Sequence, residues 1–147
     1  MSQVNDRLES LGIRLPEAPR PVAAYVPSVQ TGDLVYVSGQ IPFSEGVLLA
    51  TGMVPSQVSL EQAIAAARQC GINALAVLDA HLEGDLDRVR RIVRLGVFIA
   101  SDAGFTGQPQ IANGASDLLA EVFGESGRHA RAAVGSVALP LNATVEV

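Results

Sequence analysis

The sequence predicts an α+β fold in which two main helices cover one face of a mixed β-sheet. Two observations support this prediction. A capping box at Ser59 and Gln62 opens a run whose apolar residues recur at helical spacing as far as Leu82. Short strand patterns precede this helix, separate it from a second helix pattern, and follow the second one. The expected order is therefore βββαβαββ. No repeat or linker interrupts it, which indicates one domain over residues 1–147.

The first third of the chain is expected to hold a short helix and three strands. Apolar residues at helical spacing predict a helix over residues 3–12, and three prolines in 15–22 favour an extended connection after it. The segment Thr31-Gly-Asp33 is typical of a hairpin turn. The three strands are predicted over residues 23–28, 34–40 and 47–49.

The rest of the chain supplies the remaining elements. Gly71 lies inside the long helix, where it costs about 1 kcal/mol relative to alanine and would permit close packing. Residues 101–109 carry two glycines and a proline, which predict a loop. The other predicted elements are a strand over 92–100, a helix over 111–123, and strands over 131–137 and 143–147.

Composition and charge exclude several classes of protein. Hydrophobic residues make up 48% of the chain and the mean hydropathy is +0.30, which suggests a buried subunit interface. The net charge of −5 and the lack of a long basic run argue against a nucleic-acid partner. The N-terminus is polar, and no apolar run approaches the ~20 residues that span a bilayer. We therefore expect a cytoplasmic protein with no membrane partner.

The residue inventory also narrows the chemistry. A single cysteine, Cys70, rules out an intramolecular disulfide and argues for an inert buried thiol. Neither His81 nor His129 has a partner at metal-ligand spacing, so no metal site is predicted. Lysine is absent, which removes Schiff-base catalysis on a lysine and internal attachment of pyridoxal phosphate. We expect no cofactor.

Arg131 is the residue with the most unusual setting. It lies among small and apolar residues, so its guanidinium must lose water or point into a cleft. The planar fork of a guanidinium suits bidentate capture of a carboxylate. The alternative is an arginine paired with a structural carboxylate or exposed at the start of a strand.

Other candidate residues lie at strand ends. Glu146 alternates with apolar neighbours on the last predicted strand, so it faces either solvent or a site. Small residues at Ser38 and Gly39 would let a ligand approach the backbone, although they also suit a strand entering a turn. Tyr25 either lines a site with its ring or packs in the core or at an edge.

Several segments together resemble the Rid family, also called YjgF-like proteins. They are Tyr25, residues 35–42 (Val-Tyr-Val-Ser-Gly-Gln-Ile-Pro), residues 130–134 (Ala-Arg-Ala-Ala-Val), the pair Leu139-Pro140 and residues 145–147 (Val-Glu-Val). The resemblance runs from about residue 22 to the C-terminus. It implies a chorismate-mutase-like (YjgF-type) fold that assembles as a homotrimer, with sites in clefts between subunits. It also implies hydrolysis of 2-aminoacrylate-type enamines and their imine tautomers to 2-keto acids and ammonia.

The resemblance assigns roles to residues on two parts of the chain. Arg131 matches the arginine that holds the substrate carboxylate, and Asn113 matches a helix asparagine near the site. Where the family usually has a cysteine, this chain has Ala133, whose contribution would come mostly from its backbone.

The second part lies near the ends of the chain. Glu146 matches the glutamate that positions or activates water, and Tyr25 matches the tyrosine that lines the cleft. Ser38 and Gly39 match residues that contact the substrate.

Other functions stay open at this point. The same clefts could bind small carboxylate metabolites, such as 2-keto acids, without catalysis. RNA cleavage is reported for some relatives, but the acidic, lysine-free composition argues against it. Chorismate mutase activity is suggested by the fold alone.

Overall fold

The computed structural model describes residues 2–20 and 23–147. Within this part of the chain, the helices are α1 (Gln3–Ser10), α2 (Leu60–His81) and α3 (Gln108–Phe123). The strands are β1 (Ser28–Thr31), β2 (Leu34–Val37), β3 (Phe43–Ser44), β4 (Val47–Leu48), β5 (Arg94–Ala100), β6 (Ala130–Ser136) and β7 (Val145–Glu146).

The strands form a mixed arrangement, as predicted, although they do not form the single sheet that was expected. The main sheet has the order β6-β5-β7, with β6 parallel and β7 antiparallel to β5. The β1-β2 and β3-β4 hairpins are hydrogen-bonded separately. Strand β2 ends at Val37, although the strand was predicted to run to residue 40. Pro42 follows shortly after and could not donate a hydrogen bond to a neighbouring strand. Beyond it, Gln40 exchanges two backbone hydrogen bonds with Val147, of 2.7 and 2.9 Å, and so ties this segment to the end of β7.

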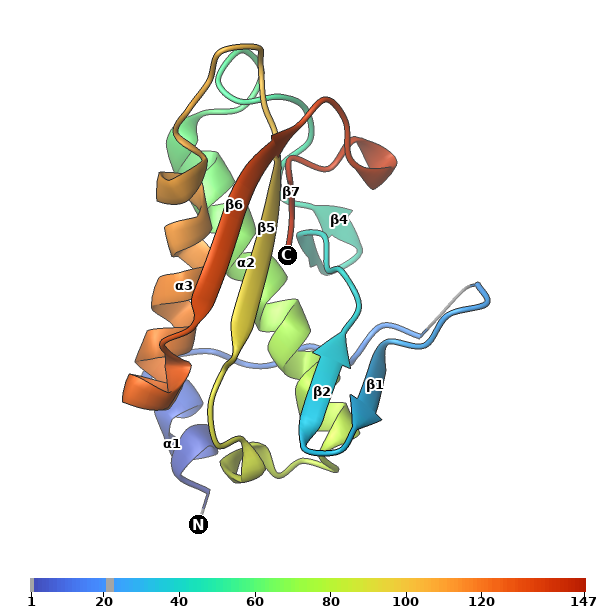
Figure 1. Cartoon of the computed structure of the whole chain (residues 1–147), viewed down its shortest axis with the longest axis vertical. Coiled ribbons are helices and arrows are strands. Elements are labelled where there is room, and N and C mark those ends of the chain that lie inside the picture. Colours follow the sequence, from blue (N-terminus) through green and yellow to red (C-terminus); the bar gives the residue numbers. More distant parts are fainter. Residues whose placement is uncertain (1, 21–22) are drawn as a thin grey trace.

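Both long helices cover the same face of the main sheet, which confirms the predicted α+β class (Figure 1). The capping box at Ser59 and Gln62 starts α2 with reciprocal hydrogen bonds, each 3.1 Å long. Small residues bring α2 and α3 close together. A Cβ on Gly114 would overlap the carbonyl of Ile64, and one on Gly71 would lie 2.9 Å from a methyl group of Leu118. The glycine at position 71 therefore permits close packing, as expected.

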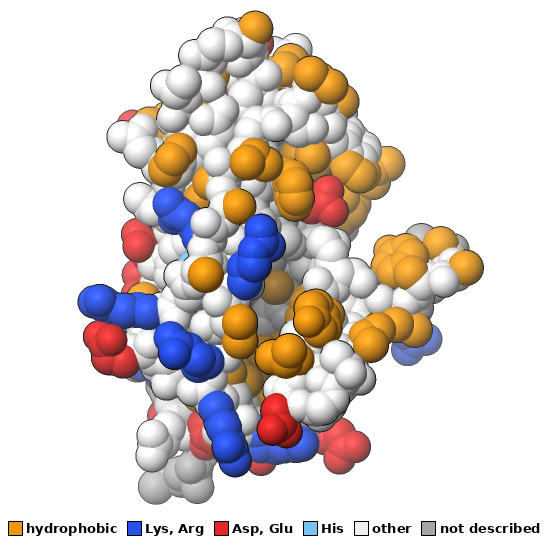
Figure 2. All heavy atoms as spheres, in the orientation of Figure 1, with side chains coloured by type: hydrophobic (Ala, Val, Ile, Leu, Met, Phe, Trp, Pro, Cys, Tyr) orange, Lys and Arg blue, Asp and Glu red, His pale blue; other side chains and the backbone are white. Residues whose placement is uncertain are grey.

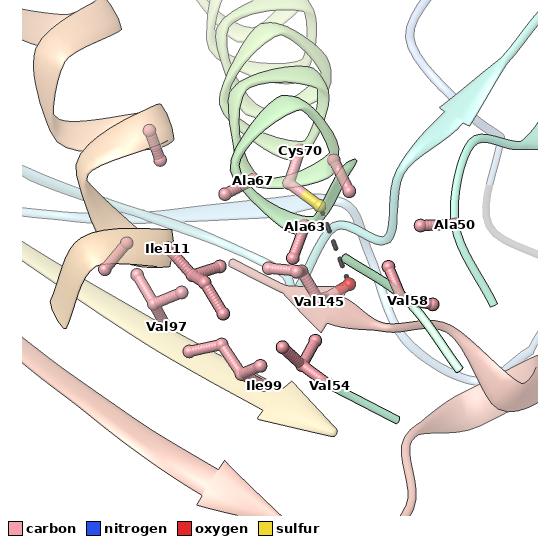
Figure 3. Packing of buried hydrophobic residues seen from close by; sticks show 13 residues of the cluster. Ala50, Val54, Val58, Ala63, Ala67, Cys70, Val97, Ile99, Ile111 and Val145 are labelled. Atoms are coloured by element: carbon pink, nitrogen blue, oxygen red, sulfur yellow. Dashed lines mark hydrogen bonds between the residues drawn. The ribbon is translucent and has the colours of Figure 1, made fainter. Parts of the chain in front are cut away.

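The core between the helices and the sheet consists of small and branched apolar residues. Figure 3 shows the side chains of α2 and α3 meeting those of β5 and β7. Cys70 lies fully buried in this layer, and its thiol points at the carbonyl of Val145, 3.6 Å away. The low aromatic content of the sequence thus corresponds to a tightly spaced alanine, valine and isoleucine core.

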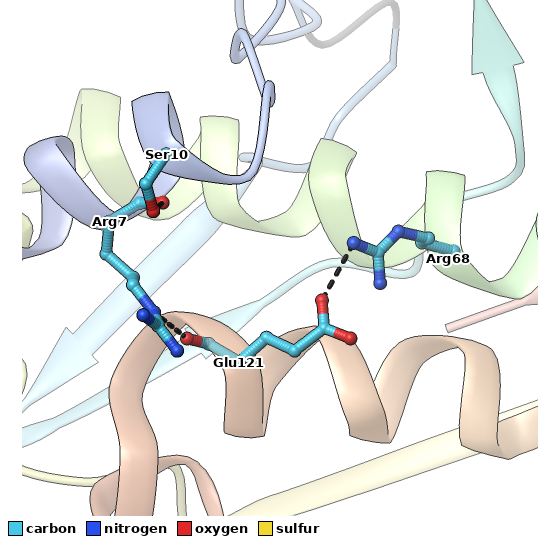
Figure 4. Close-up of polar contacts among 4 residues, drawn as sticks. All are labelled: Arg7, Ser10, Arg68 and Glu121. Atoms are coloured by element: carbon cyan, nitrogen blue, oxygen red, sulfur yellow. Dashed lines mark hydrogen bonds and ion pairs between the residues drawn. The ribbon is translucent and has the colours of Figure 1, made fainter.

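The N-terminal helix packs against α3 and is fixed at both ends. At its start, both carboxylate oxygens of Asp87 accept backbone hydrogen bonds, from Gln3 and Val4. At its end, Arg7 donates from Nε to the carbonyl of Glu121 at 2.8 Å, and the Glu121 carboxylate pairs with Arg68 on α2 (Figure 4). Glu121 therefore links all three helices.

Some predicted boundaries were wrong for local reasons. Residues 23–25 and Pro27 form bends, and β1 begins only at Ser28. The predicted hairpin turn is confirmed, since Thr31 pairs with Leu34 across Gly32 and Asp33. The pair Phe43–Ser44, which lies between two of the predicted strands, itself forms a strand that pairs with β4.

The second long helix begins three residues before the predicted start, because Pro109 falls within its first turn, where no N–H is needed. The N-terminal helix, in contrast, ends at Ser10, two residues before the predicted end.

The face of the sheet opposite the helices carries exposed apolar side chains. Phe98 on β5 and Val134 on β6 are 47% and 45% exposed and are register partners. Figure 2 shows this side of the molecule, where hydrophobic groups gather most densely on the side of β4 and β7 and arginines lie lower on the same face. Among the described residues, none of the helices has the length and apolar content needed to cross a bilayer.

Candidate functional site

A row of hydrogen-bond acceptors on α3 holds the guanidinium of Arg131. Nη1 donates to Asn113 Oδ1 at 2.7 Å and to Ser116 Oγ at 3.1 Å, and Nη2 donates to the carbonyl of Pro109 at 3.3 Å. These positions are spaced by four and three residues, so they lie on one face of α3. Arg131 lies on β6 and belongs to its helix-facing side, because its register partner is Leu95, which packs in the core.

All three of these acceptors are neutral. In the described part of the chain, no Asp or Glu oxygen lies within 4.0 Å of this guanidinium, which excludes a structural ion pair there. The side chain is exposed, and its Nε–H and one Nη2–H have no partner among the described residues. Two unused donors and an uncompensated charge suit a bidentate carboxylate ligand.

A shallow depression of about 430 Å³ adjoins Arg131. Its lining includes Ser116 and Asp117 from α3 and His129 from the segment that leads into β6. Ala133, two residues along β6 from Arg131, is half-buried on the same face of the strand and packs against the core. The structure therefore brings together Arg131, Asn113 and Ala133, which we call the arginine half-site.

A second cluster forms where β7 meets the end of β2. The carboxylate of Glu146 lies directly over Gly39, where a Cβ would overlap its Oε1. The backbone pairing of Gln40 with Val147 fixes this contact, because it holds residues adjacent to Gly39 and Glu146 side by side. Only glycine at position 39 leaves room for this carboxylate.

Ser38 extends this cluster toward Tyr25. Its hydroxyl donates to the carbonyl of Val26 at 2.7 Å, and its backbone N–H donates to the carbonyl of Pro27 at 2.9 Å. Tyr25 itself is 55% exposed and makes no side-chain hydrogen bond within the described residues. Ser38, Gly39 and Glu146, with the neighbouring segment that carries Tyr25, form the glutamate half-site.

The two half-sites lie on opposite faces of the main sheet. Arg131 is paired with Leu95 of β5, whereas Glu146 is paired with Phe98. Residues three apart on a strand point to opposite faces and are separated by about 10 Å along it. Arg131 and Glu146 of one chain therefore do not converge on one small molecule.

Other reactive groups have structural surroundings. Burial, and next the negative charge of Glu146, raise the pKa of the Cys70 thiol far above its ordinary value, so the nucleophilic thiolate is disfavoured. His81 ends α2 and contacts Ser28 and Gln30 of β1. The described residues contain no group of three or more His, Cys, Asp or Glu side chains that could hold a metal ion.

Ser116 and His129 also contribute to the arginine half-site, although the sequence alone did not point to them. Ser116 lies three residues after Asn113 and therefore on the same face of α3, a spacing that could have signalled a second polar group facing β6. Its hydroxyl lies 3.0 Å from Nε2 of His129. His129 had no assigned role because its partner is distant in sequence. In the other half-site, buried Asn73 donates to the carbonyls of Ile41 and Phe43 and so fixes the segment after Gly39.

A family match and two relatives over most of their lengths link this chain to known proteins. Residues 5–147 match the family described as "YjgF/chorismate_mutase-like, putative endoribonuclease". The chain is 46% identical to Protein TCP17 of Trypanosoma cruzi over 146 residues, which cover 99% of this chain and 91% of that protein. It is 34% identical over 136 residues to a 2-iminobutanoate/2-iminopropanoate deaminase of Dermatophagoides farinae, covering 92% and 90% of the two proteins.

Solved structures agree with this match. The protein Atu1372 of Agrobacterium tumefaciens, whose function is unknown, superposes with a TM-score of 0.89 at 46% identity. The alignment covers 97% of this chain and 87% of Atu1372.

Proposed function

This chain belongs to the YjgF/chorismate mutase-like family, and we propose that it hydrolyses 2-imino acids and their enamine tautomers to 2-keto acids and ammonia. The observation that supports the proposal most directly is the Arg131 guanidinium, oriented by three neutral acceptors and left without a carboxylate partner among the described residues. An arginine held in this way is prepared for an anionic ligand. We further propose that the chain forms a single domain, assembles as a cytoplasmic homotrimer and needs no cofactor.

Arg131 would bind the carboxylate of the substrate. The substrates in the name of the Dermatophagoides farinae relative, 2-iminobutanoate and 2-iminopropanoate, both carry a carboxylate next to the C=N carbon. The two unused donors of Arg131 match the two oxygens of such a group, and the Asn113 amide would keep the guanidinium in plane with it.

Glu146 would act on water. Its carboxylate accepts a proton from a water molecule whose oxygen adds to the electrophilic imine carbon, while the imine nitrogen takes up a proton. The resulting amino alcohol collapses: the C–N bond breaks, and Glu146 returns its proton to the departing nitrogen. As the C=O bond forms, the hydroxyl proton leaves to solvent, which replaces the proton that the imine nitrogen took up from solvent. One imino acid and one water thus give one keto acid and one ammonia.

A complete site would require two subunits. The half-sites of one chain face opposite sides of its sheet, so Arg131 of one protomer would meet Glu146 of the next. In a closed ring of three, each interface joins two different surfaces, which is the geometry that this arrangement needs. The exposed apolar residues around Phe98 and Val134 support burial of this face between subunits.

RNA cleavage is the weaker proposal even though the family description includes an endoribonuclease. The net charge of −5 opposes binding of a polyanion, and acidic and apolar groups lie among the arginines on the face shown in Figure 2.

The proposal is tested by competition with semicarbazide. An amino-acid oxidase generates imines from a series of amino acids, and loss of the semicarbazone reports their hydrolysis. The wild-type protein should suppress semicarbazone formation, and Arg131→Ala should reduce kcat/KM by at least about 10²-fold through loss of a charged bidentate contact. Equal suppression by both proteins would refute the role of Arg131.

Glu146→Gln separates catalysis from simple binding. It should lower kcat by about 10²- to 10⁴-fold while 2-oxobutanoate still binds, since the arginine half-site is unchanged. A folded trimer that binds 2-oxobutanoate but never hydrolyses an imine would instead favour a non-catalytic carboxylate-binding protein.

A further inference from the structure

We propose that Ser116 and His129 are positioning residues that set the orientation of Arg131, and through it the affinity of the site for the substrate carboxylate. The inference rests on the proposed function for its link to substrate. Neither Ser116 nor His129 is among the site residues that the sequence predicted.

The four groups involved form one directed chain of hydrogen bonds. His129 Nδ1 lies 2.7 Å from the carbonyl of Gly127, which can only accept, so this nitrogen carries the ring proton. In the neutral ring, Nε2 is then an acceptor, and the Ser116 hydroxyl donates to it across 3.0 Å. The oxygen of Ser116 keeps its lone pairs for Arg131 Nη1, 3.1 Å away.

The far end of this chain is rigid. Gly127 is buried, and a Cβ there would overlap the carbonyl of Leu119 on α3. Its own carbonyl is therefore fixed relative to α3, and it fixes the tautomer and the plane of the His129 ring. His129 is half-buried between α3 and β6, and this burial limits the other orientations that its ring can adopt.

Without this chain, the Ser116 hydroxyl could rotate to donate to another acceptor. Its hydrogen could then face the guanidinium, and its oxygen would no longer accept the hydrogen bond from Arg131 Nη1. With the ring proton on Nδ1, Nε2 of His129 prevents this because it accepts the hydrogen bond from the only hydroxyl hydrogen. Arg131 then keeps two partners on Nη1, Asn113 and Ser116, and its remaining donors stay turned outward. The structure thus assigns His129 a role through Ser116 and not through direct contact with substrate.

The test compares matched variants of the full-length protein. Ser116→Ala and His129→Leu remove links in the chain, whereas His129→Gln retains an acceptor that can replace Nε2. His81→Leu is the control, because it replaces the other histidine, which also contacts a serine hydroxyl but lies at the C-terminal end of α2, outside this chain of hydrogen bonds. Three properties are measured: the kinetics of imine hydrolysis, the affinity for 2-oxobutanoate, and the rotation of the Arg131 guanidinium by nitrogen-15 NMR.

Loss of one hydrogen bond to a charged group should lower kcat/KM and 2-oxobutanoate affinity by about fivefold to tenfold in Ser116→Ala and His129→Leu. The value of kcat should stay within about twofold, because the arginine acts in binding. His129→Gln and His81→Leu should behave like the wild type. The guanidinium of Arg131 should rotate faster only in the two variants that break the chain.

An unchanged kcat/KM and unchanged Arg131 rotation in His129→Leu would overturn the inference, as would a His129→Gln variant no better than His129→Leu. The NMR measurement needs no turnover. If the wild type neither hydrolyses imines nor binds 2-oxobutanoate, the proposed function fails, while the rotation of Arg131 still decides whether Ser116 and His129 position it.

Discussion

Replacing Gly39 with alanine should disable Glu146 without removing the arginine that binds substrate. A Cβ at position 39 would overlap Glu146 Oε1 and would lie 3.0 Å from its carboxyl carbon and 3.3 Å from its Cγ. The backbone on both sides is fixed by the pairing of Gln40 with Val147, so the carboxylate is the part that must move.

The size of the effect follows from that movement. To regain ordinary contact distance, the carboxylate oxygen must shift by ~1 Å or more. A displacement of this size can reduce a rate by about 10²-fold, and loss of a general base costs about 10²- to 10⁴-fold. We therefore expect kcat to fall by about 10²-fold in Gly39→Ala.

The semicarbazide assay measures this loss, and a double-mutant cycle identifies its cause. If Gly39→Ala acts through Glu146, adding it to Glu146→Gln should cause little further loss. Thermal unfolding and the oligomeric state should match the wild type. A double variant that is far less active than Glu146→Gln alone would show that the methyl group blocks the substrate directly, which would refute this reasoning.

Three further predictions concern stability and reactivity. Hydrogen bonds, first from the Val4 N–H, hold the pKa of Asp87 below its ordinary value of 3.8, so the Asp87 carboxylate stabilises the folded state above that pH. The hydrogen-exchange protection factors of the α1 amides should therefore decrease as pH falls through the lowered pKa, whereas those of Asp87→Asn should not change with pH there. Gly114→Ala forces a methyl group against the carbonyl of Ile64 and should destabilise the fold by about 1–3 kcal/mol in denaturant titration; an unchanged midpoint would contradict the tight α2–α3 contact. Cys70 should resist alkylation at pH 8 in the native protein and react after unfolding, as followed by mass spectrometry; rapid native labelling would contradict its burial.

Local sequence signals predicted the parts of the fold that depend on neighbouring residues. The capping box at Ser59 set the start of α2, and Gly32 with Asp33 set the first hairpin turn. Strand β1 was predicted too early in the chain, because residues 23–27 have a strand-like composition. Prolines lie at 21 and 27, and whether a segment pairs with another strand depends on tertiary contacts that its own sequence does not reveal. The separation of the strands into three hydrogen-bonded groups likewise depends on tertiary packing.

The sequence predicted individual residues of the candidate site but not how they are arranged, because the arrangement depends on tertiary packing. Arg131 and Glu146 stood out by residue type and setting, and the family resemblance gave both a role. Sequence could not reveal that they lie on opposite faces, because this depends on the register of β5 with both of its neighbours. The contacts of Ser116 with Arg131 and His129 join residues thirteen or more positions apart, so spacing along one element does not report them.

The most direct test of the proposed site between subunits mixes two inactive variants. Arg131→Ala and Glu146→Gln are unfolded together in equal amounts, refolded, and assayed for imine hydrolysis beside each variant refolded alone. If each site combines Arg131 of one protomer with Glu146 of another, random assembly leaves roughly a quarter of the sites with both residues intact, and about that share of wild-type activity should return. If mixed oligomers form and stay as inactive as the separate variants, the two residues do not act together across a subunit interface, and the account is contradicted.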